Sequence, residues 1–203
     1  MNARSTDQPA GDATSGAPLR IAVIVASEGR YGPLITEWFS QLASTREDFK
    51  LDVISLPKAN LPTWLPDGPD DSIASFEARL DEADAFVIVT PEYNHSFPAG
   101  VKHAIDLTRD CWGGKPVAMI AYGGRSGGLR AVEPLRPVLA TLGAVTIANT
   151  VSFHVVQDQF DEDGQPVDPA GLNTAGVALL DELTWWAQPL RTARANRPYP
   201  SMW

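Results

Sequence analysis

Three short segments carry the residues whose types and spacing could do chemistry. The segment YGGRSGG (122–128) places Ser126 in a G-x-S-x-G pattern, which is typical of the nucleophile turn of serine hydrolases. The same glycines suit a second role, because a backbone without Cβ atoms lets a flat ligand ring lie close to its amides. A tight glycine turn of purely structural value is the third interpretation.

A serine hydrolase of α/β architecture needs an acidic residue and then a histidine downstream of its nucleophile. His154 is the only histidine after Ser126, and the one carboxylate between them is Glu133. Use of Asp158 or Asp161 as the acid would break the expected order. The sequence therefore favours the ring-binding interpretation and predicts no catalytic side chain.

The segment PEYNHSFP (91–98) suits the edge of a binding site. Pro91 restricts the backbone, which favours a preset loop over a flexible lid. Tyr93 offers a flat apolar face to a ligand. Glu92 and Asn94 can bond the polar edges of a ligand or hold the loop. His95 could donate a proton, but a histidine in a loop more often only forms hydrogen bonds or packs.

The segment SEGRYGP (27–33) leads into a helix, where free amides and the helix dipole favour a phosphate group. Ser27 can donate a hydroxyl, Arg30 a guanidinium and Tyr31 a phenol to such an anion. The segment matches neither the Walker A pattern nor G-x-G-x-x-G.

Apolar runs predict the strands that position these segments. Continuous runs at 19–27, 84–90 and 115–122 predict strands buried on both faces. The run 49–56 alternates, which predicts an edge or half-exposed strand, and 144–156 covers a fifth strand and an extension.

Helical spacing of apolar residues predicts a helix after each strand. These helices cover Leu34–Leu42, a segment capped by Asp70 or Asp71, Ala99–Arg109, Leu129–Leu142 and Asn173–Leu190. Pro134 and Pro137 predict a kink or a late start in the fourth. The alternation predicts an α/β fold with a doubly wound five-stranded parallel sheet and helices on both faces.

In such folds a ligand binds at the carboxyl ends of the strands, where the strand order reverses. Loop one (27–33), loop two (91–98) and loop three (122–128) each follow a predicted strand. We therefore expect these three loops to converge on one site.

Composition excludes several classes of function. The 203 residues carry a net charge of −9, which disfavours nucleic-acid binding. The single Cys111 excludes an internal disulfide and is expected to be a small buried hydrophobe, while three scattered histidines predict no metal site. No segment is apolar enough for membrane insertion. We expect a cytoplasmic protein with a disordered tail at 1–18, one domain at 19–192 and a C-terminal tail at 193–203.

The stretches TPEYNHSFPAGVKHAIDL and GKPVAMIAYGGRSGGLRAVEPLRPVL resemble the NADPH-dependent FMN reductase family of flavodoxin-like proteins. That family includes quinone, azo-dye and chromate reductases, and the likeness runs from about Arg20 to Ala187. The resemblance implies a flavodoxin-like fold, a non-covalent FMN and two-electron transfer from NADPH or NADH to a small-molecule acceptor. It also implies a homodimer or homotetramer, for which Trp112, Trp185 and Trp186 are interface or core candidates.

The resemblance also assigns residues to parts of the flavin. Those expected to border the isoalloxazine ring are Pro91, Glu92, Tyr93 and Asn94. Those expected along its pyrimidine end are Tyr122, Gly123, Gly124 and Arg125. Those at the phosphate position are Ser27, Arg30, Gly32 and Pro33. Loop one departs from the family pattern, in which Gly-Ser-x-Arg opens a slightly longer loop.

Two other functions fit the same fold. A one-electron carrier like flavodoxin usually has a Thr/Ser-rich phosphate loop, which this sequence lacks. A flavin-binding or regulatory subunit without turnover would share every motif described above.

Overall fold

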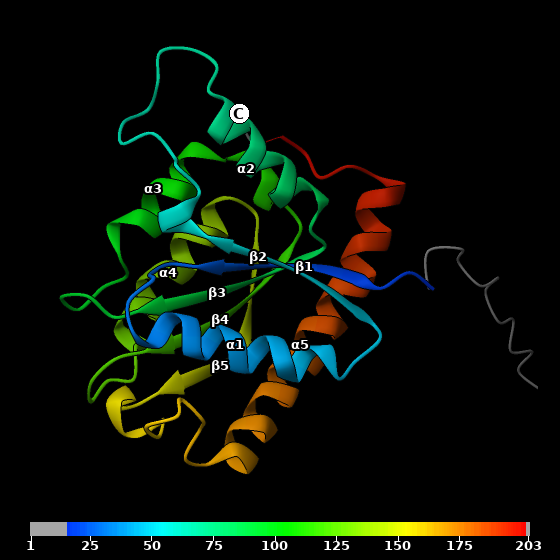
Figure 1. The fold of residues 1–203 in the computed structure, drawn as a ribbon. Helices are drawn as coiled ribbons and strands as arrows, with labels where there is room; N and C mark the ends of the chain where they lie inside the picture. Colours follow the sequence, from blue (N-terminus) through cyan, green and yellow to red (C-terminus); the bar gives the residue numbers. More distant parts are fainter. Residues whose placement is uncertain (1–15, 202–203) are drawn as a thin grey trace, which may run out of the picture.

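The strands of the computed structural model, which describes residues 16–201, form one parallel sheet in the order β2-β1-β3-β4-β5 (Figure 1). Their bounds are β1 (Leu19–Val25), β2 (Phe49–Ser55), β3 (Ala85–Pro91), β4 (Pro116–Tyr122) and β5 (Val145–Phe153). The predicted five-stranded doubly wound sheet is confirmed. Most of the tail predicted at 1–18 lies outside the described residues.

The burial of each strand follows its place in the sheet. Every residue of β3 and β4 is buried, because these central strands are covered by helices on both faces. β2 lies at one edge and is only partly buried, as its alternating sequence predicts. β5 forms the other edge, and its register with β4 shifts between Val117 and Met119.

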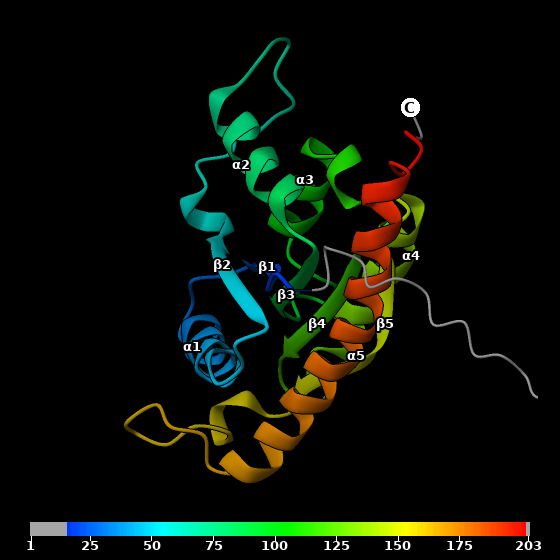
Figure 2. The same ribbon diagram turned by 90° about the vertical axis from the view of Figure 1, so that its right-hand side faces the viewer.

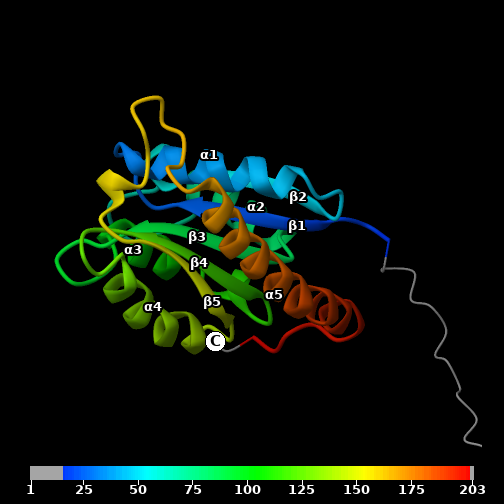
Figure 3. The ribbon, with the colours of Figure 1, turned by 90° about the horizontal axis from the view of Figure 1, so that it is seen from below.

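Five α-helices cover the sheet in two layers (Figures 2 and 3). They are α1 (Tyr31–Ser44), α2 (Asp71–Glu82), α3 (Ala99–Leu107), α4 (Leu129–Thr141) and α5 (Pro169–Asn196). α1 and α5 pack on one face through apolar residues such as Phe39 and Leu183. α2, α3 and α4 pack on the other through residues such as Leu80, Ile105 and Leu135.

The starts of two helices differ from the sequence prediction, and that of a third agrees with it. α1 begins at Tyr31, inside the segment predicted as a turn, because a proline in the first helical turn is compatible with a helix. α4 begins at Leu129, the first residue of its predicted range, so the late start, one of the two alternatives predicted from its prolines, is wrong. α5 begins at Pro169, where the Asp168 side chain accepts a hydrogen bond from the Gly171 amide at 2.9 Å.

α5 also ends later than predicted, at Asn196, and so reaches into the segment predicted as a C-terminal tail. The cap predicted for α2 is confirmed: the Asp70 side chain accepts hydrogen bonds from the amides of Ser72 and Ile73. The long loop before α2 projects from the top of the molecule in Figures 1 and 2 and exposes Trp64 and Leu65.

The tryptophans divide between core and surface. Trp112 is buried, with its ring centre 4.6 Å from that of Phe86, so it is a core residue. Trp185 is 67% exposed on α5. Cys111 is buried as expected, and this burial raises the pKa of its thiol to about 12.

Candidate functional site

The three loops meet at the carboxyl edge of the sheet, which is the left-hand edge in Figure 1. The Ser27 Oγ of loop one lies 3.2 Å from the Tyr93 hydroxyl of loop two. The Glu92 amide of loop two donates to the Tyr122 carbonyl of loop three at 2.9 Å. The strand order reverses between β1 and β3, so the loops lie where this fold class binds its ligands.

Loop one is a tight turn packed against the first turn of α1. The Ser27 hydroxyl accepts a hydrogen bond from the Gly29 amide at 3.2 Å. A side chain at Gly32 would collide with the Ser27 carbonyl, so glycine permits this close approach. Arg30 is exposed, with its guanidinium 5.4 Å from the centre of the Tyr31 ring.

A second cation beside loop one comes from a segment that sequence reasoning did not single out. Lys58 lies in a short 3₁₀ helix after β2, and its Nζ is 2.6 Å from the Glu28 carboxylate. This contact lowers the pKa of Glu28. Lys58 is distant from loop one in sequence, so no local pattern could have indicated the pairing.

Loop two contains a two-residue hairpin turn. The amide of Tyr93 donates to the Ser96 carbonyl at 2.9 Å, and the Ser96 amide donates back at 3.1 Å. Asn94 (φ 50°) and His95 (φ 69°) occupy the centre with positive φ angles, as a type I′ turn requires. The turn leaves Tyr93 51% exposed, with its ring available to a ligand.

The four glycines of loop three differ in conformation and in surroundings. Gly127 (φ 63°) and Gly128 (φ 86°) adopt left-handed conformations that other residues rarely adopt. A Cβ at Gly123 would lie 3.3 Å from the Glu92 Cβ, so this position is packed against loop two. A Cβ at Gly124 would meet no atom within 4 Å, which leaves open space over the backbone there.

The backbone of loop three is held by the segment that directly follows β5. The amides of Val155 and Val156 donate to the carbonyls of Gly124 (2.8 Å) and Gly123 (3.0 Å). Val155 has a φ of 47°, an unusual conformation for a β-branched residue. Within residues 16–201 the amides of Gly124 and Arg125 donate no hydrogen bond, so both remain available to a ligand.

Tyr122 lies beneath the loops. Its side chain is buried, and burial raises the pKa of its phenol to about 12. Its hydroxyl lies under α1, 3.0 Å from where a Cβ at Gly32 would stand. Three other predicted site residues are exposed at the margins: Pro33, Asn94 and Arg125.

The geometry of Ser126 does not support a hydrolytic nucleophile. Its Oγ donates to the Glu92 carboxylate at 2.5 Å. The two ring nitrogens of His154 contact the Arg125 carbonyl (3.0 Å) and the Ser152 hydroxyl (3.2 Å) instead. Ser126 therefore lacks the neighbouring base that would activate it.

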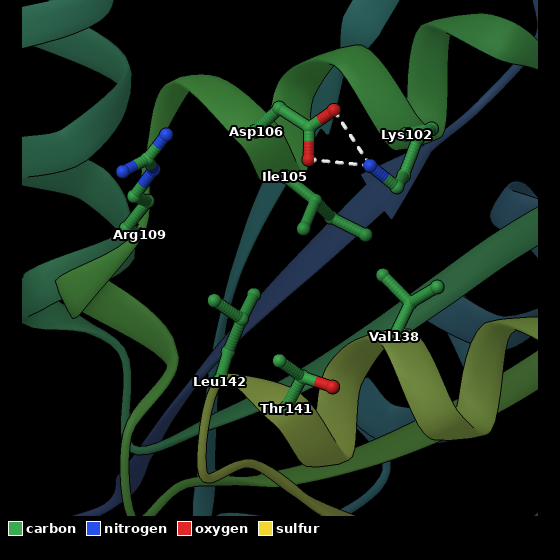
Figure 4. Close-up of a pocket in the computed structure, with 7 residues that line it drawn as sticks. All are labelled: Lys102, Ile105, Asp106, Arg109, Val138, Thr141 and Leu142. Atoms are coloured by element: carbon green, nitrogen blue, oxygen red, sulfur yellow. Dashed lines mark hydrogen bonds and ion pairs between the residues drawn. The ribbon is translucent and has the colours of Figure 1, made fainter. Parts of the chain in front are cut away.

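Two grooves adjoin the loops. One of about 340 Å³ lies between loop two and α4, and its lining residues are His95, Leu129, Arg130, Glu133 and Pro134. Another of about 230 Å³ lies between the ends of β1 and β2 and the start of α3. A third, of about 290 Å³, opens between α3 and α4 (Figure 4). This third groove reaches the carboxyl ends of both helices at Arg109 and Leu142, so it extends away from the loops.

Residues 16–201 contain no group of three or more metal-binding side chains of the His, Cys, Asp and Glu types. No helix in this part of the chain is long and apolar enough to cross a membrane.

The reversal of strand order between β1 and β3, with three convergent loops at that point, defines a flavodoxin-like α/β protein. The NADPH-dependent FMN reductase family profile matches residues 19–158, and the chain belongs to this family. FerB, a flavoenzyme NAD(P)H:(acceptor) oxidoreductase from Paracoccus denitrificans, is similar in structure. Its TM-score is 0.65 at 25% identity, over 83% of this chain and 98% of that one.

Two curated relatives extend the comparison. A 2-hydroxy-1,4-benzoquinone reductase from a Burkholderia species is 33% identical, over 70% of this chain and 80% of the relative. A probable NADPH:quinone oxidoreductase 2 from Oryza sativa subsp. japonica is 31% identical, over 59% of this chain and 62% of the relative. The chain spans only about three fifths of the length of the rice protein and of an FMN reductase from Schizosaccharomyces pombe.

Proposed function

We propose that this protein is an NAD(P)H-dependent FMN reductase of the quinone reductase type. Membership of the family and the names of its relatives support this assignment. The observation that carries it is the convergence of three loops around open space above Gly124 at the reversal of strand order. The acceptor would be a quinone, an azo compound, a metal oxyanion or free flavin.

The site has the features that an FMN molecule needs. A flat ring requires backbone without side chains, and Gly124 presents such a surface together with two free amides. The exposed Tyr93 ring offers an apolar contact nearby. A phosphate requires positive charge and donors, which Arg30, the Ser27 hydroxyl and the N-terminus of α1 would supply.

Each loop would then have one task. Loop one would bind the phosphate through Ser27, Arg30 and Tyr31, with Gly32 and Pro33 shaping the start of α1. Loop two would border the ring through Pro91, Glu92, Tyr93 and Asn94. Loop three would line the pyrimidine end through Tyr122, Gly123, Gly124 and Arg125.

Bound FMN would supply the redox chemistry, taking two electrons from a nicotinamide and delivering them to the acceptor. The protein would orient the reactants and exclude water, and the hydride step itself would need no side chain as acid or base. The groove of about 340 Å³ between loop two and α4 adjoins the proposed ring position, and part of either reactant would enter it.

A turnover assay separates this proposal from a one-electron carrier and from a subunit without turnover. Purified chain loaded with FMN should oxidise NADPH or NADH steadily in the presence of quinones, azo dyes or free FMN. A carrier would bind FMN but oxidise nicotinamides poorly, and an inactive subunit would not oxidise them. No nicotinamide oxidation with any acceptor would reject the proposal.

We further propose that the enzyme acts in the cytoplasm as a homodimer or homotetramer. A single buried thiol suits a reducing compartment, and the exposed Trp185 and Trp64 are apolar side chains that an interface would cover. Sedimentation velocity at micromolar concentrations tests the assembly. A monomer throughout this range would contradict it.

A further inference from the structure

The Glu92 carboxylate joins three segments at the centre of the site. Its side chain is only 11% exposed. Its Oε2 accepts hydrogen bonds from the Ser126 hydroxyl at 2.5 Å and from the Arg130 amide at 3.3 Å. Its Oε1 lies 3.6 Å from the Arg130 guanidinium. Glu92 belongs to loop two, Ser126 to loop three and Arg130 to the first turn of α4.

The contacts of Glu92 replace the N-terminal cap that α4 lacks. The residue before α4 is Gly128, which has no side chain and so cannot satisfy the free amides of the first turn. A carboxylate near a helix N-terminus accepts such amides and interacts favourably with the helix dipole. Glu92 therefore caps α4 from a different part of the chain.

The chemistry of the carboxylate argues against direct flavin binding through the same atoms. Oε2 already accepts two protein donors, and Oε1 faces the Arg130 guanidinium at 3.6 Å, so the charge of the carboxylate is balanced within the protein. The polar edge of an oxidised isoalloxazine ring consists mostly of acceptors, which a carboxylate would repel rather than bind.

We propose that Glu92 is a positioning residue of the flavin site, which fixes loop three and α4 relative to loop two. This inference rests on the proposed function. Ser126, which matches the nucleophile position of a hydrolase motif, is the partner through which Glu92 acts. The opposite side of loop three is held by Val155 and Val156, so the Glu92–Ser126 bond completes the support of the ring-binding backbone.

A double-mutant cycle tests the inference on the full-length chain. The variants are Glu92→Gln, Ser126→Ala and the double variant, and the measurement is the FMN dissociation constant from quenching of flavin fluorescence. Each single change should weaken binding by about tenfold, as expected for a charged hydrogen bond, and the double variant should bind no more weakly than Glu92→Gln. The absorption spectrum of bound FMN should change similarly in both single variants.

Glu182→Gln is the matched control. The Glu182 carboxylate also accepts two amides from another segment, those of Ala148 and Asn149 at 2.9 and 2.8 Å, but this pair lies in the irregular part of β5, away from the loops. Its loss should lower the melting temperature while leaving FMN affinity and the flavin spectrum unchanged. Altered FMN affinity in this control would reduce the effect at Glu92 to general stability and overturn the inference.

Two other results would also test the role of Glu92. If Glu92→Gln weakens FMN binding while Ser126→Ala has no effect, Glu92 does not act through Ser126 and the inference is wrong. If wild type binds no FMN, the proposed function fails, but the contact remains testable. The cycle is then measured on the melting temperature of the apoprotein, where additive losses at Glu92 and Ser126 would reject the coupling.

Discussion

At the scale of single residues, two glycines of loop three differ in what a side chain would meet. Gly128 is required by the fold of the loop, and Gly124 is expected to be required by the ligand. Gly128 has a φ of 86°, and a Cβ there would stand 2.6 Å from the Tyr122 amide nitrogen. Gly124 has open space in the same direction. A side chain is thus excluded at Gly128 by the protein itself, whereas at Gly124 only a ring bound as proposed would exclude it.

Substitution at these two positions should therefore have opposite effects. Gly128→Ala should lower the free energy of unfolding by at least about 1–2 kcal/mol, because it forces a left-handed conformation on alanine and places its Cβ against backbone atoms of β4. Gly124→Val should leave that free energy near the wild-type value but weaken FMN binding by about 1–3 kcal/mol through overpacking. Urea unfolding of the apoproteins and FMN titration measure both quantities. Unchanged FMN affinity in Gly124→Val would place the ring elsewhere.

Arg30 provides a test of the phosphate end. It is exposed at the start of α1 and forms no ion pair with an acidic residue among residues 16–201, whereas Lys58 is paired with Glu28. If Arg30 binds the phosphate, Arg30→Ala should weaken FMN binding by about 1.5–3 kcal/mol and riboflavin binding much less. Calorimetric titration with the two ligands makes the comparison, and Lys58→Ala shows whether the second cation contributes. Equal losses for FMN and riboflavin would mean that Arg30 does not contact the phosphate.

The residues that form the loops were predictable from sequence, whereas the contacts between them were not. Positive φ at Asn94 and at the glycines follows local preferences of those residue types. The bond between Glu92 and Ser126 joins residues 34 positions apart and leaves no local pattern. The left-handed Val155 contradicts its own preference, so only the surrounding structure explains it.

At the scale of elements, the strands were predicted well because burial on two faces leaves a continuous apolar run. The helix ends were predicted less well. The start of α5 had a readable signal, an Asp-Pro pair at 168–169 that caps and opens a helix. The shift of register in β5 had no such signal, because the amides of Ala148 and Asn149 at this point donate to Glu182, a distant residue of α5.

Lys115 shows how the end of α2 is bound to the start of β4. Its Nζ donates to the carbonyls of Leu80 (2.7 Å) and Asp81 (3.1 Å) in the last turn of α2. Burial, and then the nearby Arg194, lower the pKa of Lys115 to about 8. An unfolded lysine keeps a pKa near 10.4. Between these values the unfolded chain binds more protons than the folded chain, so the free energy of unfolding rises with pH.

We therefore expect the stability of wild type relative to Lys115→Met to increase from pH 8 to pH 10, by at most about 1.4 kcal/mol per pH unit. Urea unfolding of both proteins across this range gives the difference. Comparison with Lys115→Met cancels the titration of other groups, because methionine retains the apolar stem without a charge. A difference that stays constant or falls with pH would contradict the expectation.

At the scale of the whole molecule, the two edges of the sheet have separate roles. The carboxyl edge carries the loops of the candidate site. At the amino edge, Arg191 and Arg194 of α5 lie 3.5 Å from the Asp84 carboxylate, directly before β3. These contacts connect the last helix to the centre of the sheet. Ligand binding at one edge can therefore be tested without disturbing the contacts that hold the other.

Binding of FMN to the folded chain alone should stabilise the whole molecule by mass action. One site at a free FMN concentration a hundred times the dissociation constant adds about 2.7 kcal/mol to the free energy of unfolding. The melting temperature should rise with FMN concentration, with one flavin bound per chain at saturation. Riboflavin, which lacks the phosphate, should give a smaller rise, and AMP, which lacks the isoalloxazine ring, should give little. An equal rise with AMP would indicate a phosphate site without a flavin site, and no rise with FMN at tens of micromolar would reject the flavin assignment.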